Sequence, residues 1–416
     1  MTNAKVEKPW DVVVVGAGAA GLMAAIQAGR AKKETSRVLL LDGAKKIGAK
    51  ILVSGGGRCN VTHYKVDESS FFGGSPKAIR KVLRRFDVAD TSSFFSEAGV
   101  ELKQEETGKL FPVSDSAQSV LGALVREANA AGVSLRNPWR VQRMSKSEQG
   151  FKIESDTGET VLAHRVILAT GGKSIPKSGS DGFGYSLAQS FGHTITDRVF
   201  PALVPLLLKK KNPLLDLSGV SFPGRLSVQV GNRKPLFSCR GSVLCTHFGL
   251  SGPAVLDISR HYLAAAFDEE PDLRLSFVPG EEDTIESELL GLGTRSVGSF
   301  LRIVLPERLA RVVCTLADVD PDTRGSELKR DQRKALLQTL TNYAIPVAGD
   351  RGFRFAEVTA GGVPLGEVRL NTMESRACPG LYLCGEICDV DGRIGGFNFQ
   401  WAWASGFVAG RASVSD

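Results

Sequence analysis

The segment DVVVVGAGAAGLMAA, Asp11–Ala25, decides how this chain folds. Four valines precede three glycines with G-x-G-x-x-G spacing, and small apolar residues follow them. The continuous β-branched run predicts a buried strand, and the Ala- and Leu-rich residues Ala19–Ala31 predict a helix. A second buried strand is expected at Arg37–Leu41, directly before Asp42. The pattern therefore predicts a βαβ unit at the start of a Rossmann-type domain.

The three glycines of this segment have separate roles in a dinucleotide-binding turn. Gly16 permits the tight turn, Gly18 lets a pyrophosphate approach the backbone, and Gly21 lets the helix pack on the strand. The helix N-terminus faces the anion. Asp42, about twenty residues on, suits a ribose hydroxyl and disfavours a 2′-phosphate. The alternative is a glycine-rich turn without a ligand, and the glycines alone leave NAD and FAD open. The residues expected to hold the dinucleotide are Gly16, Ala17, Gly18, Ala19, Ala20, Gly21 and Asp42.

The composition is that of an ordinary globular protein of 416 residues, with 42% hydrophobic and 23% charged residues. The net charge of +7, without a Lys/Arg stripe among aromatic residues, is too small to predict a nucleic-acid partner. Seven scattered cysteines indicate a reducing compartment rather than a disulfide framework. No apolar run reaches the ~18 residues of a membrane span, and the first ten residues lack an apolar signal core. We therefore expect a cytoplasmic protein that does not associate with a membrane.

The pattern along the chain predicts a split α/β domain with two insertions. Residues 1–192 and 349–416 read as the two parts of a Rossmann-type domain. Residues 193–283 carry short strand-like runs without βα alternation, which indicates a β-rich, barrel-like insertion on the substrate side. Residues 284–348 read as a small helical insertion.

Three elements of the first part are expected from periodicity and turn residues. Apolar residues at helical intervals predict a helix over Pro76–Gly99. A hairpin is expected between Phe151–Glu154 and Thr160–Leu162, followed by a separate buried strand at Val166–Ala169.

Two further segments bear on which dinucleotide is bound. ILATGG, Ile167–Gly172, resembles the strand end that closes over the cofactor in FAD-binding proteins of the two-dinucleotide-domain type. GLYLCGEICDVD, Gly380–Asp391, resembles their C-terminal segment, where a strand ends in Gly-Glu or Gly-Asp. Between Asp42 and Thr170 the sequence has no second G-x-G-x-x-G. The resemblance therefore implies one dinucleotide, FAD rather than NAD.

More specific strings extend the resemblance over nearly the whole chain. They are KILVSGGGRCNVT (Lys50–Thr62), LFPVSDSAQSVLGAL (Leu110–Leu124), THFGLSGPAVLDIS (Thr246–Ser259), TAGGV (Thr359–Val363) and GEICDVDGRIGGFNFQWAWASG (Gly385–Gly406). With these motifs in this order, the chain resembles the HI0933-like (BaiN/YhiN) bacterial flavoproteins, also called the aminoacetone oxidase family. The family fold is an FAD-binding Rossmann domain split by a barrel-like and a helical insertion. Members are linked to aminoacetone oxidation and to C=C reduction in bile-acid intermediates, and these chemistries differ.

The resemblance also implies which residues approach the cofactor. The glycine turn and Asp42 would hold the ADP half, Val141 would lie near the adenine, and Asp391 near the ribityl chain. The remaining implied contacts are Lys50, Ser54, Gly55, Gly56, Gly57, Arg58, Cys59, Asn60, Thr170, Gly171, Gly172, Gly385, Glu386, Gly395, Gly396, Phe397, Asn398 and Gln400. The chain departs from the family at Asp42, where Glu is common, and at Lys109, where Arg is common. Neither departure removes FAD binding, although Lys lacks the bidentate geometry of Arg.

The residues by themselves agree with these roles. Gly55–Gly57 form a backbone loop that can press against a flat or anionic ligand, with a flexible turn as the alternative. Gly395 and Gly396 precede a helix whose N–H groups can face the negative edge of a reduced flavin, with an ordinary N-cap as the alternative.

Candidates for catalysis are few, because a flavin carries the hydride chemistry itself. His247 is our first candidate for a proton donor, against a purely structural histidine. Cys59 is a candidate redox thiol, but it has no C-x-x-C partner, which favours a packed thiol. Cys384 and Cys388 have no histidine near them at ligand spacing, so we expect no metal site.

The sequence thus predicts an FAD-dependent oxidoreductase that acts on a small organic substrate. An external NAD(P)H is a possible donor, since no dedicated domain for it is present. Two alternatives from other classes are a flavin-dependent RNA-modifying or RNA-binding protein and a redox-sensing flavoprotein without turnover. The sequence leaves the substrate, the electron donor and the oligomeric state open.

Overall fold

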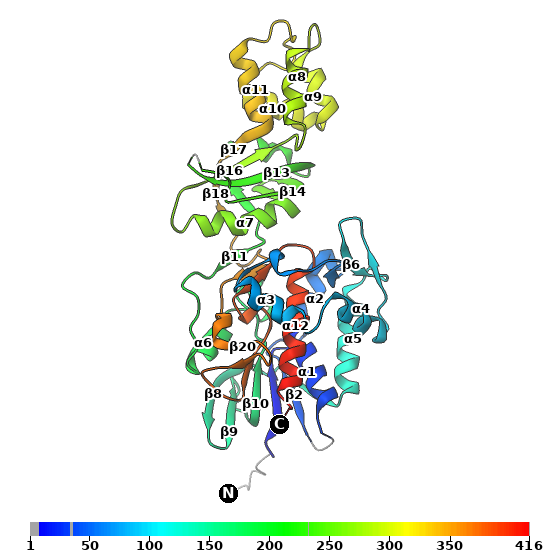
Figure 1. Ribbon diagram of the computed structural model, residues 1–416, viewed down its shortest axis with the longest axis vertical. Coiled ribbons are helices and arrows are strands. Elements are labelled where there is room, and N and C mark those ends of the chain that lie inside the picture. The colour runs from blue at the N-terminus through cyan, green and yellow to red at the C-terminus, as the bar shows by residue number, and fades with distance from the viewer. Residues whose placement is uncertain (1–7, 34–35, 232, 416) are drawn as a thin grey trace. The chain divides into compact units, whose positions relative to one another are not determined.

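A computed structural model of the protein describes residues 8–33, 36–231 and 233–415 (Figure 1). Residues 1–7, which belong to the segment expected to lack a secretion signal, lie outside the described residues. The chain divides into two compact units. The split unit comprises Met1–Phe200 and Val358–Asp416, and the inserted unit comprises Pro201–Glu357.

The split unit is built on a largely parallel sheet in the order β20-β21-β22-β10-β1-β2-β7. The valines of β1 pair in parallel with β2 on one side and β10 on the other, so β1 is covered on both edges and its valines are buried. The strands are β1 (Trp10–Val15), β2 (Val38–Leu41), β7 (Val133–Arg136), β10 (Thr160–Leu168), β20 (Val368–Arg369), β21 (Glu374–Ser375) and β22 (Leu381–Leu383). In addition, β9 (Gly150–Ser155) pairs with β10, and β8 (Val141–Ser147) pairs with β9.

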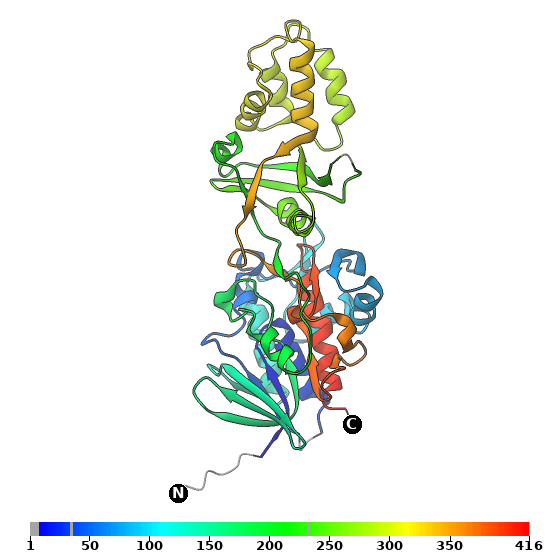
Figure 2. The same ribbon diagram turned by 90° about the vertical axis from the view of Figure 1, so that its left-hand side faces the viewer.

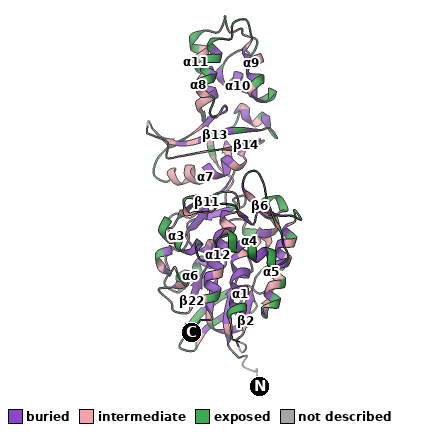
Figure 3. Ribbon diagram, turned by 45° about the vertical axis from the view of Figure 1, so that its right-hand side comes forward, coloured by how far each residue is buried: buried purple, intermediate pink, exposed green. Residues whose placement is uncertain are grey.

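Two helices from opposite ends of the sequence, α1 (Ala19–Ala31) and α12 (Phe397–Ala412), pack closely beside this sheet (Figure 3). Glycines on α12 make the close approach possible. A Cβ atom on Gly406 would lie 2.5 Å from the carbonyl oxygen of Ala20, and one on Gly410 would lie 2.2 Å from that of Ala24. The indole N–H groups of Trp401 and Trp403 are satisfied inside the core, because they donate to backbone oxygens of Gly385 and Val61.

The split unit has further helices, 3-10 turns and small strands. Its helices are α2 (Ala49–Val53), α3 (Pro76–Leu83), α4 (Val88–Glu97), α5 (Ala117–Ala130) and α6 (Phe183–Ser190), with 3-10 turns at Ser54–Gly57, Glu68–Ser70, Pro176–Ser178, Leu365–Glu367 and Gly385–Ile387. Its small strands are β3 (Thr62–His63), β4 (Phe71–Gly73), β5 (Leu102–Gln104), β6 (Lys109–Pro112), β11 (Phe200–Ala202), β19 (Val358–Ala360) and β23 (Val390–Gly392), where β11 ends two residues beyond the unit.

Two local predictions were wrong. The helix expected over Pro76–Gly99 is two helices, α3 and α4, because Asp87 forms a capping box that starts a new helix. The strands expected at Thr160–Leu162 and Val166–Ala169 are one continuous strand, β10, which pairs with β9 along its first half and with β1 and β22 along its second.

The inserted unit is an antiparallel sheet in the order β17-β16-β13-β14-β15-β12-β18 with helices beside it (Figure 2). Every second residue of β13 is buried, as expected for a sheet with one face on a core. The strands are β12 (Leu206–Leu208), β13 (Ser221–Val230), β14 (Phe237–Thr246), β15 (Gly249–Ser251), β16 (Pro271–Ser276), β17 (Tyr343–Ile345) and β18 (Val347–Asp350). The helices are α7 (Pro253–Ala265), α8 (Glu282–Leu290), α9 (Val297–Val304), α10 (Glu307–Ala317) and α11 (Arg330–Asn342), with a 3-10 turn at Pro213–Leu217.

Each unit has its own hydrophobic core. One cluster of buried side chains lies within the split unit, and a second joins the sheet of the inserted unit to its helices. The regions expected as a β-rich and a helical insertion therefore share a core. Among the described residues, no helix is both long and apolar enough to cross a membrane.

The contact between α1 and α12 can be tested with Gly410→Ala. Alanine favours helix over glycine by about 1 kcal/mol, yet its Cβ would collide with the carbonyl oxygen of Ala24. We expect a net loss of about 1–3 kcal/mol in the free energy of unfolding, measured by urea denaturation. Gly366→Ala is the control, because no described atom lies within 4 Å of the position that its Cβ would take. A Gly410→Ala variant as stable as the wild type would contradict this packing.

Candidate functional site

The glycine turn between β1 and α1 combines two crowded glycines with one open glycine. A Cβ atom on Gly16 would lie 2.5 Å from the carbonyl oxygen of Ala169, and one on Gly21 would lie 1.7 Å from that of Gly16. At Gly18, no atom of the described residues beyond its neighbours in the chain lies within 4 Å of the Cβ position. The turn therefore packs against the end of β10 on one side. Its backbone is accessible at Gly18, where a ligand would approach.

The backbone N–H groups in the first turn of α1 are suited to bind an anion. Gly18 is the N-cap residue, and within the described residues no side chain caps this helix end. The N–H groups of the first turn have no partner within the helix, and the helix dipole adds positive potential there. A pyrophosphate would satisfy both demands.

Asp42, directly after β2, stabilises this turn through hydrogen bonds. Its Oδ2 atom accepts a hydrogen bond from the Ala17 N–H at 2.6 Å, and its Oδ1 atom accepts one from the Ala44 N–H at 2.7 Å. Burial raises the pKa of Asp42, and these two backbone donors oppose the rise. A contact between Asp42 and the ribose, predicted from the sequence, stays a prediction.

The SGGG loop presents bare backbone. Gly55, Gly56 and Gly57 all have positive φ, and no described atom beyond its neighbours in the chain lies within 4 Å of the Cβ position of Gly56. Arg58, which follows, is already engaged. Its Nη1 atom lies 2.5 Å from Glu105 Oε1, and its guanidinium lies 4.0 Å from the ring centroid of Phe111. An anionic ligand would have to share Arg58 with Glu105.

Two buried polar atoms in the predicted cofactor segments have no hydrogen-bond partner among the described residues. They are Oδ1 of Asn60 and Oγ1 of Thr170. Unpaired buried polar atoms are uncommon in proteins and indicate a missing ligand or water. Together with the open backbone at Gly18 and Gly56, they fit a large polar cofactor that lies along this edge of the sheet.

Four segments of the split unit meet in a hydrogen-bonded network around Glu386. Lys50 Nζ donates to Glu386 Oε2 and to Ser174 Oγ, both at 2.6 Å. Glu386 Oε1 accepts from Ser174 Oγ at 2.8 Å and from the Thr359 N–H at 3.0 Å. The Thr359 hydroxyl in turn accepts from the backbone N–H of Lys173 at 2.7 Å. The network ties the segments with the ATGG, TAGGV and GE motifs to the helix before the SGGG loop.

Sequence reasoning named Lys50 and Glu386 but missed Ser174 and Thr359. Their position is the signal that could have identified them, because Ser174 lies close to the glycine pair of the ATGG motif and Thr359 close to that of the TAGGV motif. A side chain at position 172 would disturb this network, because a Cβ on Gly172 would lie 2.5 Å from Thr359 Oγ1.

The start of α12 is held by side chains that the sequence assigned to the cofactor. Asn398 closes the preceding loop, accepting from the Gly392 N–H and donating to the Gly392 oxygen, both at 2.8 Å. Gln400 is buried, accepts from Thr62 and Thr91, and donates to the Phe86 oxygen. Their amides are therefore used within the protein, and direct contact with the cofactor stays a prediction.

Other predicted residues lie on the same segments. Gly396 has φ +95° at the N-cap of α12, which within the described residues has no side-chain cap. The ring of Phe397 stacks on that of His63 at 5.0 Å. The remaining predicted residues lie at the start of β8 (Val141), after β10 (Gly171), before α12 (Gly395), in the turn after β22 (Gly385) and in β23 (Asp391).

The two catalytic candidates belong to different units. His247 is exposed in the turn between β14 and β15 of the inserted unit. Cys59 is fully buried in the split unit, and burial raises the pKa of its thiol to about 12. A thiol with this pKa is neutral near pH 7 and a poor nucleophile. His247 therefore remains as the candidate proton donor.

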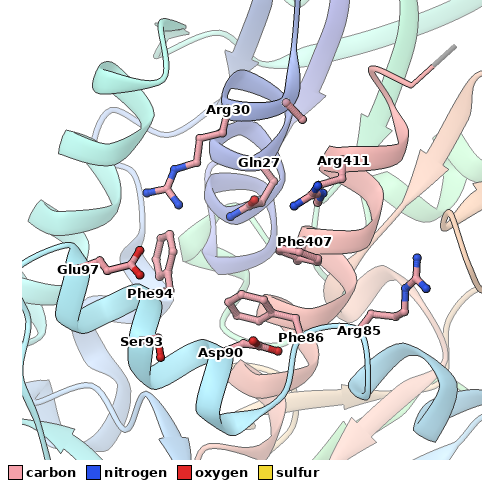
Figure 4. A pocket seen from close by; sticks show the side chains of 11 residues that line it. Gln27, Arg30, Arg85, Phe86, Asp90, Ser93, Phe94, Glu97, Phe407 and Arg411 are labelled. Atoms are coloured by element: carbon pink, nitrogen blue, oxygen red, sulfur yellow. The ribbon is translucent and has the colours of Figure 1, made fainter.

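A separate pocket of about 360 Å³ lies at the far ends of α1 and α12 (Figure 4). Its lining includes Arg30, Arg85, Phe86, Phe407 and Arg411. Because α1 rises about 1.5 Å per residue, this lining is well removed from the glycine turn at the start of that helix.

Comparison with known proteins shows the family of this chain. The family model described as the HI0933-like protein Rossmann domain matches residues 10–412. The chain belongs to the HI0933-like family. The match covers both parts of the split unit and the inserted unit, so the HI0933-like resemblance predicted from the sequence is confirmed.

Curated relatives extend over the whole HI0933-like chain. The 3-dehydro-bile acid delta(4,6)-reductase of Clostridium scindens is 38% identical over 407 residues, which are 96% of this chain and 98% of the relative. The ribosomal RNA dihydrouridine synthase of Escherichia coli is 37% identical over 413 residues, 98% of each chain.

Solved structures share the fold at low identity. Quinol fumarate reductase FrdA of E. coli has a TM-score of 0.53 at 15% identity, covering 98% of this chain and 70% of that one. The 3-ketosteroid-delta4-(5alpha)-dehydrogenase of Rhodococcus jostii has a TM-score of 0.51 at 17% identity, covering 99% of each. The predicted split Rossmann-type fold is thereby confirmed. With the family match and the 38% identical reductase, this HI0933-like protein is an FAD-dependent oxidoreductase.

The two hydrogen bonds that Asp42 accepts beside the glycine turn can be tested with Asp42→Ala. Removal of its carboxylate leaves the Ala17 and Ala44 N–H groups unpaired and frees the turn. We expect FAD to bind at least about tenfold more weakly, in line with the ~1–3 kcal/mol cost of such a loss. The measurement is titration of the apoprotein with FAD.

Asp11→Ala is the matched control for this prediction. The Asp11 carboxylate also accepts a backbone N–H from the neighbouring strand, from Arg37 at 2.7 Å, but at the opposite end of β1. It should lower stability without changing FAD affinity. Equal FAD affinities of the Asp42 and Asp11 variants would show that Asp42 does not stabilise the glycine turn for FAD binding.

Proposed function

We propose that this protein reduces a carbon–carbon double bond conjugated to a carbonyl group. The observation that carries the proposal is an agreement between relatives with different substrates. One is named for reducing a 3-dehydro-bile acid at delta(4,6), and two are named ribosomal RNA dihydrouridine synthases. A 3-oxo compound with these double bonds is a conjugated dienone. Dihydrouridine is uridine with two hydrogens added across C5 and C6, a bond conjugated to the C4 carbonyl.

The two reactions make the same chemical demands. A conjugated carbonyl polarises the double bond, so that the β carbon accepts a hydride while negative charge moves to the carbonyl oxygen. The α carbon then takes a proton, and the π bond is replaced by two C–H bonds. FAD, when bound and reduced, supplies the hydride, and an external NAD(P)H supplies the two electrons that reduce it again.

The residues of this chain divide these tasks. The glycine turn, the SGGG loop and the network around Glu386 would hold the cofactor. His247 is the proposed proton donor for the α carbon. It is exposed, and among the described residues its imidazole has only the ring contact with Phe248, so its nitrogens are open to a substrate.

A small organic molecule is the substrate that we propose first. The second candidate is a uridine in RNA, which the relatives of E. coli and Haemophilus influenzae favour at 37% and 32% identity. The net charge of +7 is compatible with both.

Acceptor-dependent reoxidation of the flavin tests the proposal. The holoprotein is photoreduced without oxygen and mixed with a 3-oxo-Δ4 steroid, with an unmodified ribosomal RNA transcript, or with a quinone, while the flavin absorbance is followed. We expect rapid reoxidation by the steroid or the RNA, with a saturated product detected by mass spectrometry. The matched controls are the saturated steroid and an RNA that already carries dihydrouridine. Reoxidation by quinone or oxygen alone, or none at all, would refute the proposed reaction.

A further inference from the structure

The split unit has a cavity of about 360 Å³ that is well removed from the glycine turn. It is the pocket at the far ends of α1 and α12, and α4 and the turn between α3 and α4 complete its lining (Figure 4). Its volume falls in the range of small-molecule pockets, roughly 300–1,000 Å³. Every residue that lines it belongs to the split unit, so the pocket is formed within one compact unit.

The floor of this pocket is aromatic and held in place. The rings of Phe86 and Phe407 stack with their centroids 4.7 Å apart, and the ring of Phe94 meets that of Phe86 edge to face at 6.4 Å. The Phe86 oxygen accepts a hydrogen bond at 2.9 Å from the buried amide of Gln400, which fixes the turn between α3 and α4. Such a floor suits the flat, apolar part of a ligand.

Gln27 is the polar group that the fold buries beside this floor. It is only 5% exposed, and within the described residues its one side-chain hydrogen bond runs from Nε2 to the Met23 sulfur at 3.6 Å. Because a thioether is a weak acceptor, the amide oxygen and the second N–H remain open to a ligand. In Figure 4 the amide points into the space between the arginines and the phenylalanine rings. A buried amide with open donor and acceptor positions calls for a partner that satisfies both.

Three guanidinium groups surround the pocket. Arg30 is engaged, because its Nη2 atom lies 2.6 Å from Glu127 Oε2. Arg85 and Arg411 are exposed and have no carboxylate partner among the described residues, although the Arg411 guanidinium lies 5.4 Å from the ring centroid of Phe407. Guanidinium groups with unused N–H donors are suited to bind phosphate oxygens in a bidentate way.

Two carboxylates of α4, from Asp90 and Glu97, also line the pocket. Oδ2 of Asp90 accepts the Asp87 N–H at 2.9 Å in the capping box, which fixes the orientation of this side chain. Carboxylates accept hydrogen bonds from sugar hydroxyls, as in the ribose contact of dinucleotide sites. The pocket therefore combines an aromatic floor, an open amide, carboxylates and available guanidinium groups.

We propose that this pocket binds a nucleoside phosphate. The base would lie on the phenylalanine floor with its donor and acceptor edge on the Gln27 amide, the ribose would lie beside α4, and Arg85 and Arg411 would bind the phosphate. Arg30 is about 18 Å along α1 from Gly18, so this site is additional to the FAD cradle. The inference is independent of the proposed reaction. A free mononucleotide and the adenosine phosphate end of NAD(P)H share this chemistry.

The test is calorimetric titration of the FAD-loaded protein with AMP, with NADP⁺ and with inorganic phosphate. FAD fills the glycine turn of this protein, so AMP cannot bind there. We expect one nucleotide per chain, with at least about tenfold weaker binding in the double variant Arg85→Met, Arg411→Met, because charge-assisted hydrogen bonds are lost. Gln27→Leu, of similar size without the amide, should weaken nucleotide binding and leave phosphate binding unchanged. Tighter binding of AMP than of NADP⁺ identifies a free mononucleotide as the occupant, and the reverse identifies the dinucleotide.

Arg84→Met is the matched control, because Arg84 is exposed, directly precedes Arg85 and does not line the pocket. It should bind nucleotide as the wild type does, and every variant should keep its FAD content. A wild type that binds neither AMP nor NADP⁺, or a double variant that binds them as tightly as the wild type, would overturn the inference. An equal loss in Arg84→Met would also overturn it, since the effect would then be one of net charge. Inorganic phosphate that binds as tightly as AMP would contradict recognition of the nucleoside.

Discussion

The close backbone approach at the glycine turn is the constraint on which the rest of the structure depends. Gly21 must lie against the oxygen of Gly16, and Gly16 against that of Ala169, for α1 to start directly above the sheet. On the other side of α1, Gly406 lets α12 approach the oxygen of Ala20. Any side chain at these positions would separate the two helices from each other or from β10. The same contacts leave Gly18 and the first turn of α1 exposed to an anion.

What could be predicted from the sequence follows from local patterns with strict steric causes. Glycine spacing, a valine run and an acid after the second strand are sufficient for the βαβ unit. Long-range effects were out of reach. The break between α3 and α4 depends on the cap by Asp87, and the role of Gln400 depends on Thr62 and Thr91, which are distant in sequence. Asp42 was found by its spacing, but its use of the Ala17 N–H was not.

The residues expected to hold the cofactor and the proposed proton donor lie in different units of the chain. Backbone groups at the glycine turn and the SGGG loop would recognise features that every FAD presents. The inserted unit carries His247, the proposed proton donor.

The measurement that tests the central claim most directly is identification of the cofactor released from the purified protein. The protein is denatured under mild conditions, and the supernatant is analysed by absorbance and mass spectrometry. We predict FAD, in an amount equal to that of the protein chain. Release of NAD or FMN instead, or a colourless protein that also fails to bind added FAD, would contradict the account.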